Sequence, residues 1–308
     1  MKRLVLLAAQ TALLFALTPA VAQAETWLFA AAACPAWKAV PDDPELTAKM
    51  AGACQKDVDL IVDGFRTSFG VTEDHITTLV NAQATGTRVK AALAELAAHA
   101  KPEDTVIIYV NTHGGKVEAM YKGYEVKDEI FAWYTVERPA DVAAATADDT
   151  WMTAHAFRDS VNQIMAEKIV TVIEACHADA SLNDYINNVH NGIGGRGEDW
   201  PGREAVIFSA HEEQIANFTS DGTEALFTQV WSDALKQDRH ASLFDSFEQA
   251  RLETHHQARA ACEQGHTHAE LVEGWSNYRL MCTQMPTAWD PFGLLEDIRA
   301  EHVDYGMN

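Results

Sequence analysis

Short apolar runs rich in β-branched residues alternate along this chain with longer stretches in which apolar residues recur at helical spacing. Such runs predict buried strands, and the longer stretches predict amphipathic helices. The expected strands cover residues 26–32, 75–80, 106–110, 130–134, 169–173 and 205–210. The expected helices cover about 45–68, a stretch after Thr87, about 154–165 and a stretch after Glu224, and much of 240–308 also looks helical.

Strands that alternate with helices are typical of an α/β fold, here a three-layer α/β/α sandwich around a mostly parallel sheet. We therefore assign residues 25–239 to one α/β domain and residues 240–308 to a helical C-terminal extension. Two helix starts are marked by capping residues. Thr87 can cap one helix, and Asp221 with Glu224 forms a capping-box pattern ahead of another.

The first residues form a pattern of their own. Met1-Lys2-Arg3 is basic, residues 4–17 are apolar, and Ala22-Gln23-Ala24 is a small-residue cleavage signal. This order predicts a signal peptide over residues 1–24 and an exported protein, periplasmic or secreted. A retained membrane anchor is the alternative, but the apolar stretch is shorter than the ~20 residues of a spanning helix.

The net charge of the chain is −22 and its pI is about 4.8. A nucleic-acid partner would need a basic face, so this class of function is excluded. The acidic surface weakly favours cationic substrates.

Four of the five cysteines form two couples that are close in sequence, Cys34 with Cys54 and Cys262 with Cys282. Disulfides persist in exported proteins, so we expect these couples to be bonded. Four cysteines allow three connectivities, and some could simply be buried thiols. In this pairing Cys176 is left over.

Cys176 comes three residues after the apolar run 169–173, and His113 comes three residues after the run 106–110. Reactive groups of parallel sheets gather at the carboxyl ends of the strands. A thiolate that attacks an acyl carbon, with a histidine that moves protons, is the machinery of a cysteine hydrolase. Gly114 after the histidine suits close approach of a substrate to the backbone.

Strand-His113-Gly114, followed by strand-Glu174-Ala175-Cys176-His177-Ala178-Asp179, resembles the caspase-like cysteine peptidases, which include caspases, metacaspases, legumains and gingipains. The likeness covers about residues 26–236, and we place the chain beside exported members of bacterial type. It implies that His113 is the general base and acid, that Cys176 is the nucleophile, and that the amides of Gly114 and Cys176 form the oxyanion hole. The resemblance also implies that the substrates are proteins or peptides. It does not indicate the oligomeric state.

The flanks of both motifs depart from the metacaspase pattern, since Asn111-Thr112 precedes His113 and Glu174-Ala175 precedes Cys176, as in legumains. In the family the acid two places before the nucleophile lines the pocket for the residue before the cleaved bond. Glu174 would therefore bind Arg or Lys, or Asn as in legumains. An inactive relative that serves as a binding protein of the cell envelope is the other alternative.

Residues 187–203 read as a long loop where caspases carry a cleavable linker, so Arg196 and Arg203 are candidate self-cleavage sites. A plain surface loop is the alternative. Four histidines could suggest zinc, but their spacing matches no tight template, so we expect no metal site. They are His255, His256, His266 and His268. No cofactor is expected, and calcium remains open because some metacaspases bind it.

Overall fold

The computed structural model describes residues 24–34, 44–121, 124–133, 151–181, 202–237, 241–263 and 283–300. Its strands are β1 (Thr26–Ala32), β2 (Ile76–Val80), β3 (Thr105–Asn111), β4 (His113–Tyr121), β5 (Tyr124–Ala132), β6 (Trp151–Thr153), β7 (Lys168–Glu174), β8 (Arg203–Phe208) and β9 (Thr287–Trp289). Its α-helices are α1 (Pro44–Phe69), α2 (Gly86–His99), α4 (Ala154–Val161), α6 (Leu226–Gln237), α7 (Leu243–Glu263) and α9 (Leu294–Asp297). Short 3-10 helices cover Glu73–His75, Asn81–Gln83 and Ala178–Ser181.

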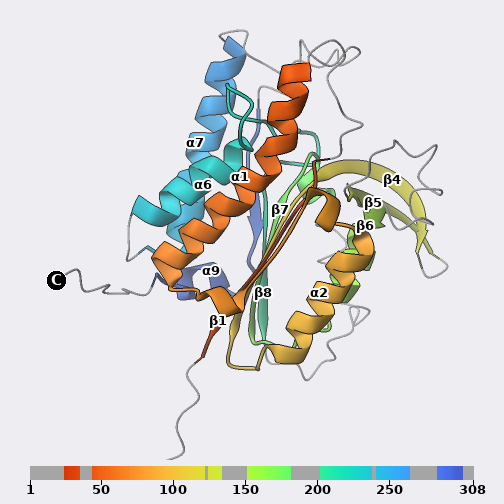
Figure 1. The fold of residues 1–308 in the computed structure, drawn as a ribbon, viewed down its shortest axis with the longest axis vertical. Coiled ribbons are helices and arrows are strands. Elements are labelled where there is room, and N and C mark those ends of the chain that lie inside the picture. The colour runs from red at the N-terminus through yellow and green to blue at the C-terminus, as the bar shows by residue number, and fades with distance from the viewer. Residues whose placement is uncertain are drawn as a thin grey trace, which may run out of the picture.

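The central sheet has the strand order β2-β1-β3-β7-β8-β9. All neighbours pair in parallel except β9, which runs antiparallel to β8. Helices α1, α6 and α7 cover one face of this sheet, and α2 covers the other (Figure 1). The α/β class and the mostly parallel sheet are therefore confirmed.

Side chains alternate between the two faces of each strand, so the sheet separates two apolar cores. Val58 and Ile61 of α1 and Trp231 of α6 pack in one core with Tyr109. On the opposite face, Val89, Leu93 and Phe157 pack with the alternate strand residues. The predicted buried face of α2, with Val89, Leu93 and Leu96, is confirmed.

Both predicted helix starts are shifted. Thr85, not Thr87, is the N-cap of α2, and its side chain accepts a hydrogen bond from the backbone N–H of Arg88. Asp221 accepts hydrogen bonds from Thr219 and Thr223 in a turn that ends before α6 begins at Leu226. The capping-box prediction was wrong because these acids hold the turn rather than the first helical N–H groups.

The region after residue 240 is helical in α7, but it also contributes β9 to the central sheet. Leu294 and Leu295 of α9 are fully buried in the core that faces α6. This part of the extension therefore completes the sheet rather than standing apart from it. The sequence indicated only helices here because β9 is three residues long.

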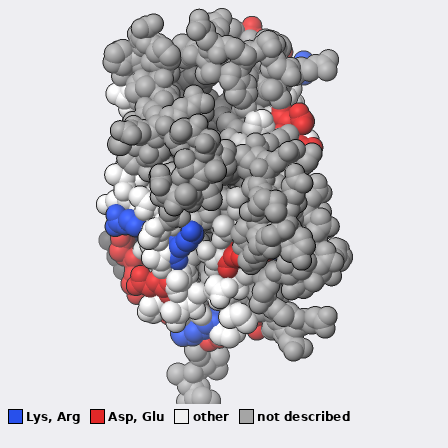
Figure 2. Space-filling model, turned by 90° about the vertical axis from the view of Figure 1, so that its right-hand side faces the viewer, with Lys and Arg blue, Asp and Glu red and all other residues white. Residues whose placement is uncertain are grey.

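A second, antiparallel sheet has the order β4-β5-β6 and lies beside the central sheet (Figure 1). Residues 116–150 were expected to hold a few short strands such as 130–134, whereas β4 and β5 each have nine residues. No helix among the described residues is long and apolar enough to cross a membrane. On the face shown in Figure 2, the described Lys and Arg side chains lie among Asp and Glu side chains.

Candidate active site

The register of the central sheet brings the ends of β3 and β7 together. Asn111 is paired with Glu174, and the N–H of Thr112 donates to the carbonyl oxygen of Glu174 at 3.1 Å. His113 and Cys176 each lie two residues beyond that pair. The two predicted reacting residues therefore follow adjacent strands of the central sheet, at its carboxyl edge.

His113 is positioned by the second sheet. It is the first residue of β4 and pairs with Ala132 of β5, while Gly114 pairs with Phe131. Phe131 and Trp133 are fully buried. Their burial anchors β5 to the body of the protein, so the segment with His113 and Gly114 is held by its pairing with β5 and by its link to β3.

Cys176 lies in the turn that follows β7, is partly exposed, and is not part of a disulfide. The next residue, His177, has φ 61°, in the left-handed region that non-glycine residues seldom adopt. Its N–H donates to the carbonyl of Gln214 at 2.9 Å. Its Nδ1 lies 2.8 Å from the carbonyl oxygen of Glu212, which can only accept, so Nδ1 carries the proton. These bonds fasten the turn to the loop after β8.

A second set of hydrogen bonds supports the peptide just before the nucleophile. The hydroxyl of Ser209 accepts from the N–H of Ala175 at 3.2 Å. Gln284, which is fully buried, donates to the carbonyl of Ser209 at 3.1 Å and accepts from the N–H of Asn217 at 2.8 Å. Gln284 thus connects the C-terminal region to the backbone that carries Cys176.

Glu174 is 1% exposed and lies on the face of the sheet that is covered by α1 and α6. The hydroxyl of Thr228 on α6 donates to its Oε2 at 3.0 Å. No described residue hydrogen-bonds to its Oε1. Burial raises the pKa of Glu174 to about 7, although interactions with the side chain of Ser209 and with the hydroxyl and backbone of Thr228 oppose part of this rise.

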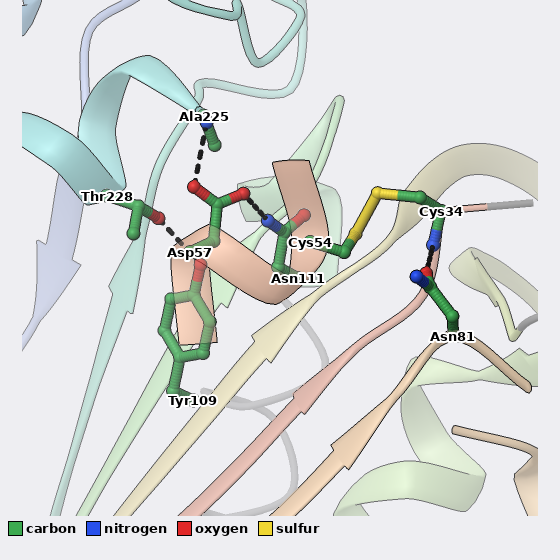
Figure 3. Close-up of a disulfide and its surroundings, with 8 residues drawn as sticks. All are labelled: Cys34, Cys54, Asp57, Asn81, Tyr109, Asn111, Ala225 and Thr228. Carbon is green, nitrogen blue, oxygen red and sulfur yellow. Dashed lines mark hydrogen bonds between the residues drawn. A yellow bond between two sulfur atoms is a disulfide. The ribbon is translucent and has the colours of Figure 1, made fainter. Parts of the chain in front are cut away.

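Asp57 on α1 is a second buried carboxylate in the same place. Its Oδ1 accepts from the N–H of Ala225 at 2.9 Å, and its Oδ2 accepts from Nδ2 of Asn111 at 2.7 Å (Figure 3). Burial raises its pKa well above the usual range, and the negative charges of Glu174 and Glu224 add to the rise. These effects outweigh the two hydrogen bonds.

Tyr109 completes this group, because its hydroxyl lies 2.6 Å from the hydroxyl of Thr228. Burial and the neighbouring carboxylates raise its pKa well above the usual range. We call these residues the buried polar cluster: Asp57, Tyr109, Asn111, Glu174 and Thr228. In the described part of the chain, no Lys or Arg forms an ion pair with Asp57 or Glu174.

Sequence reasoning selected Glu174 but missed Asp57. The available signal was its position on α1, where Cys54, Val58 and Ile61 mark the buried face. A charged residue at helical spacing among such positions is rarely buried without a partner. The sequence does not say which partner, because Asn111 and Ala225 are distant in the chain.

The predicted disulfide Cys34–Cys54 is confirmed, with an S–S distance of 2.03 Å. It joins the end of β1 to α1, next to the buried polar cluster (Figure 3). Cys282 lies outside the described residues, so the Cys262–Cys282 couple stays a prediction. The signal peptide, residues 1–24, lies outside them too except for Ala24.

Of the two candidate self-cleavage residues, Arg196 lies outside the described residues. Arg203 is the first residue of β8, and its guanidinium pairs with Asp297. Cleavage after Arg203 would require this strand to open. Among the described residues, no group of His, Cys, Asp and Glu side chains is arranged to hold a metal ion, and of the four histidines only His255 and His256 are described.

Comparison with known proteins gives matches to solved structures alone. No protein-family model and no curated protein matches the sequence. Protein GSU0716 from Geobacter sulfurreducens matches with a TM-score of 0.51 and 14% identity, over 90% of this chain and 100% of that one. At this identity the match shows a shared fold.

Two further solved structures are similar at lower scores. The structure of pro-sf-caspase-1 has a TM-score of 0.45 and 10% identity, over 87% of this chain and 92% of that one. A secreted C11 cysteine protease from Bacteroides thetaiotaomicron, in complex with an irreversible peptide inhibitor, has a TM-score of 0.43 and 9% identity. This match covers 88% of this chain and 68% of the C11 protease.

Proposed function

We propose that this protein is a cysteine endopeptidase that uses His113 and Cys176. The observation that carries the proposal is the register of β3 and β7, which puts both residues at the carboxyl edge of the sheet, each two positions beyond the Asn111–Glu174 pair. The bonds that hold the turn around Cys176 support it, because a nucleophile must be held in one position to attack efficiently.

In the proposed reaction the thiolate of Cys176 attacks the carbonyl carbon of the substrate, and a thioester forms as the amine leaves. His113 takes the thiol proton and gives it to the leaving amine, then takes a proton from the water that hydrolyses the thioester. The backbone N–H groups of Gly114 and Cys176 stabilise the oxyanion of both tetrahedral intermediates.

The residue before the cleaved bond is proposed to be Arg or Lys. Glu174 and Asp57 are buried carboxylates in one cluster, and burial opposes their ionisation. We propose that these carboxylates form the base of the substrate pocket, where the guanidinium or ammonium group of the substrate would supply the positive charge that they lack. Such charge-assisted hydrogen bonds are strong when the pocket is dry.

Cleavage after Asn is the second candidate, and the pKa of Glu174 favours it. With a pKa of about 7, part of the Glu174 population is protonated at neutral pH. A protonated carboxyl both donates and accepts, which suits the side-chain amide of Asn. Arg and Asn substrates can be separated by pH, because protonation of Glu174 weakens binding of a cation and not of an amide.

Fluorogenic peptides that differ only in the residue before the cleaved bond test the proposal. The residues would be Arg, Lys, citrulline, Asn and Asp, and the proteins wild type, Cys176→Ala and His113→Ala. His256→Ala is the matched control for His113→Ala, because His256 is exposed on α7. We expect cleavage after Arg and Lys that both site substitutions abolish and the control retains.

Other outcomes have definite meanings. Cleavage that persists in Cys176→Ala would exclude the proposed nucleophile. Absence of turnover in wild type, with the Cys176 thiol shown to react with iodoacetamide, would indicate an inactive or still latent protein. Calcium is added in one arm, and a rate that rises with calcium would show activation by the ion.

We also propose that the protein is exported, with residues 1–24 removed. The disulfide Cys34–Cys54 supports this, since disulfides persist in oxidising compartments. Amino-terminal sequencing of protein from the periplasm or the medium should begin at Glu25. Protein that keeps Met1 and stays in the membrane fraction would instead show a retained anchor.

A further inference from the structure

We propose that the Cys34–Cys54 disulfide is a positioning element of the substrate pocket, which fixes Asp57 for recognition of a cationic side chain. The inference rests on the proposed function of the buried polar cluster as that pocket. It concerns an established bond of this chain, but assigns to it a role in specificity rather than in general stability.

Cys54 and Asp57 lie three positions apart on α1, so they share one face of the helix. Both side chains are fully buried. The disulfide joins Cys54 to Cys34, immediately beyond β1, with a Cα–Cα distance of 5.9 Å. The turn of α1 that carries Asp57 is therefore tied covalently to the carboxyl edge of the sheet, where the proposed site lies.

The disulfide closes a ring of connections around Asp57 (Figure 3). The N–H of Ala33 donates to the carbonyl of Asn111 at 2.7 Å, and the side chain of Asn111 donates to Asp57 at 2.7 Å. One helical turn leads from Asp57 back to Cys54, and the disulfide returns to Cys34. Each link restricts the others, so the carboxylate has little freedom to move.

The residue after β2, Asn81, forms a hydrogen bond with the disulfide residue Cys34. The N–H of Cys34 donates to Oδ1 of Asn81 at 3.1 Å. Asn81 follows β2 and has φ 50°, in the left-handed region that Asn tolerates better than most residues. The bond therefore lies between the ends of β1 and β2 and the first half of α1, away from Cys176 in sequence but at the same edge of the sheet.

A carboxylate held in advance binds a cation more tightly than one that must first be ordered. Without the disulfide, the turn of α1 around Asp57 is held to the sheet edge by hydrogen bonds and by the core packing of Val58 and Ile61, which leave the carboxylate more freedom than a covalent link does. Substrates with a guanidinium should lose more affinity than substrates with a neutral side chain, because only the former depend on the position of Asp57. A change in selectivity separates this role from a general loss of stability.

The test compares wild type with Cys34→Ala/Cys54→Ala, using agmatine as a guanidinium probe that binds without being cleaved. Leu93→Ala is the matched control, since it creates a cavity in the core on the opposite face of the sheet. Temperatures are chosen so that both variants are fully folded by circular dichroism. Calorimetry gives the Kd of agmatine, and the arginyl and citrullinyl peptides give the ratio of kcat/KM.

We expect the double variant to bind agmatine about tenfold more weakly than wild type, with a similar fall in the arginyl-to-citrullinyl ratio. Leu93→Ala should keep the wild-type Kd and ratio. A folded double variant with the wild-type Kd would overturn the inference, and so would an equal loss in Leu93→Ala.

If the double variant does not fold, folded Cys262→Ala/Cys282→Ala protein, which retains Cys34–Cys54 as its one expected disulfide, is treated with a phosphine and compared with the same protein untreated. The phosphine is oxidised to its oxide, water supplies the oxygen and the two protons, and both sulfurs become thiols. Weaker agmatine binding by the reduced, folded protein supports the inference. Unfolding on reduction overturns it, because the bond would then serve the whole fold.

Failure of the proposed function looks different. A wild-type protein that binds agmatine but cleaves no peptide would contradict the peptidase and leave the pocket open to the same comparison. A wild-type protein that cleaves after Asn and does not bind agmatine would overturn the role proposed for the disulfide.

Discussion

Buried carboxylates lie at both edges of the central sheet, and their surroundings differ. At the amino edge, Asp104 is fully buried and accepts hydrogen bonds from the N–H groups of Glu25 and Lys101 and from the indole of Trp27, at 2.9–3.0 Å. At the carboxyl edge, the hydroxyl of Thr228 donates to Oε2 of Glu174, and Ser209 and the Thr228 backbone also oppose the rise of its pKa, but no described residue hydrogen-bonds to its Oε1.

This difference in hydrogen bonding suits a structural role for Asp104 and the proposed substrate-binding role for Glu174. Asp104 has the donors that a buried carboxylate needs, so it can join β1, β3 and the preceding turn at little cost. Glu174 and Asp57 are buried close enough to raise each other's energy when charged, which reduces the stability of the fold. Such an arrangement is typical of a binding site, where the missing charge comes from a ligand.

The largest expected effect comes from Glu174→Gln, which keeps the shape of the side chain and removes its charge. We expect kcat/KM for the arginyl peptide to fall on the order of 10³-fold, or about 4 kcal/mol, because a buried cation loses its partner. The citrullinyl peptide should change much less. Equal losses on both peptides would contradict a role for Glu174 in charge recognition.

The next effect concerns pH. A pKa of Glu174 raised from its usual 4.5 to about 7 corresponds to about 3 kcal/mol. Between these values the folded protein keeps a proton that the unfolded chain has released, so the free energy of unfolding falls as pH rises from about 4.5 to 7. The stability is fully present below pH 4.5 and lost above 7.

Urea unfolding of wild type and Glu174→Gln at pH 5 and pH 8 measures this component. The variant should gain stability relative to wild type by about 2.5 kcal/mol as pH goes from 5 to 8, because the amide does not ionise and a small part of the effect lies below pH 5. If the free energy of unfolding changes equally in the two proteins between pH 5 and pH 8, Glu174 does not titrate in this range.

A smaller effect is expected at the amino edge of the sheet, where a substitution should change stability and not substrate selectivity. Asp104→Asn should lower the free energy of unfolding by about 2 kcal/mol, because charge-assisted hydrogen bonds weaken and the amide nitrogen faces donors. Urea unfolding gives this value. The arginyl-to-citrullinyl ratio should stay at the wild-type level, and a changed ratio would remove the distinction between the two edges.

The smallest effect should come from Thr228→Val. The hydroxyl links Tyr109 to Glu174, and its loss should reduce stability by about 0.5 kcal/mol for each of the two hydrogen bonds removed, since Val fills the same space. The pKa of Glu174 should rise further, since a donor to its charged form is gone. The pH dependence of arginyl-peptide cleavage would then move to higher pH, whereas an unmoved profile would mean that the hydroxyl does not stabilise the carboxylate.

The strands β1, β2, β3, β7 and β8 could be predicted because each is a compact apolar run, and a parallel sheet buries both of its faces. The positions of His113 and Cys176 followed from those runs. The antiparallel pair β4 and β5 was mostly missed, because residues 116–132 carry many charged side chains among the apolar ones. Tertiary context decides such a segment more than its own pattern does.

Asp57 and β9 could not be predicted for a different reason. Asp57 is explained only by Asn111 and Ala225, which meet it across the fold. Strand β9 consists of Thr287–Trp289 and forms because β8 offers it an edge. Cys34–Cys54 was predictable because export gives closely spaced cysteines a physical reason to pair.

The order in which this chain is made gives β9 a further importance. Residues 283–298 supply the last strand of the sheet, the buried leucines of α9 and the bond from Gln284 to Ser209. A growing polypeptide that has reached only α7 therefore has an open edge at β8, and open edges invite pairing with other chains. We expect the turn that holds Cys176 to reach its folded form late in synthesis, so that its nucleophile becomes competent only once nearly all of the described fold is in place.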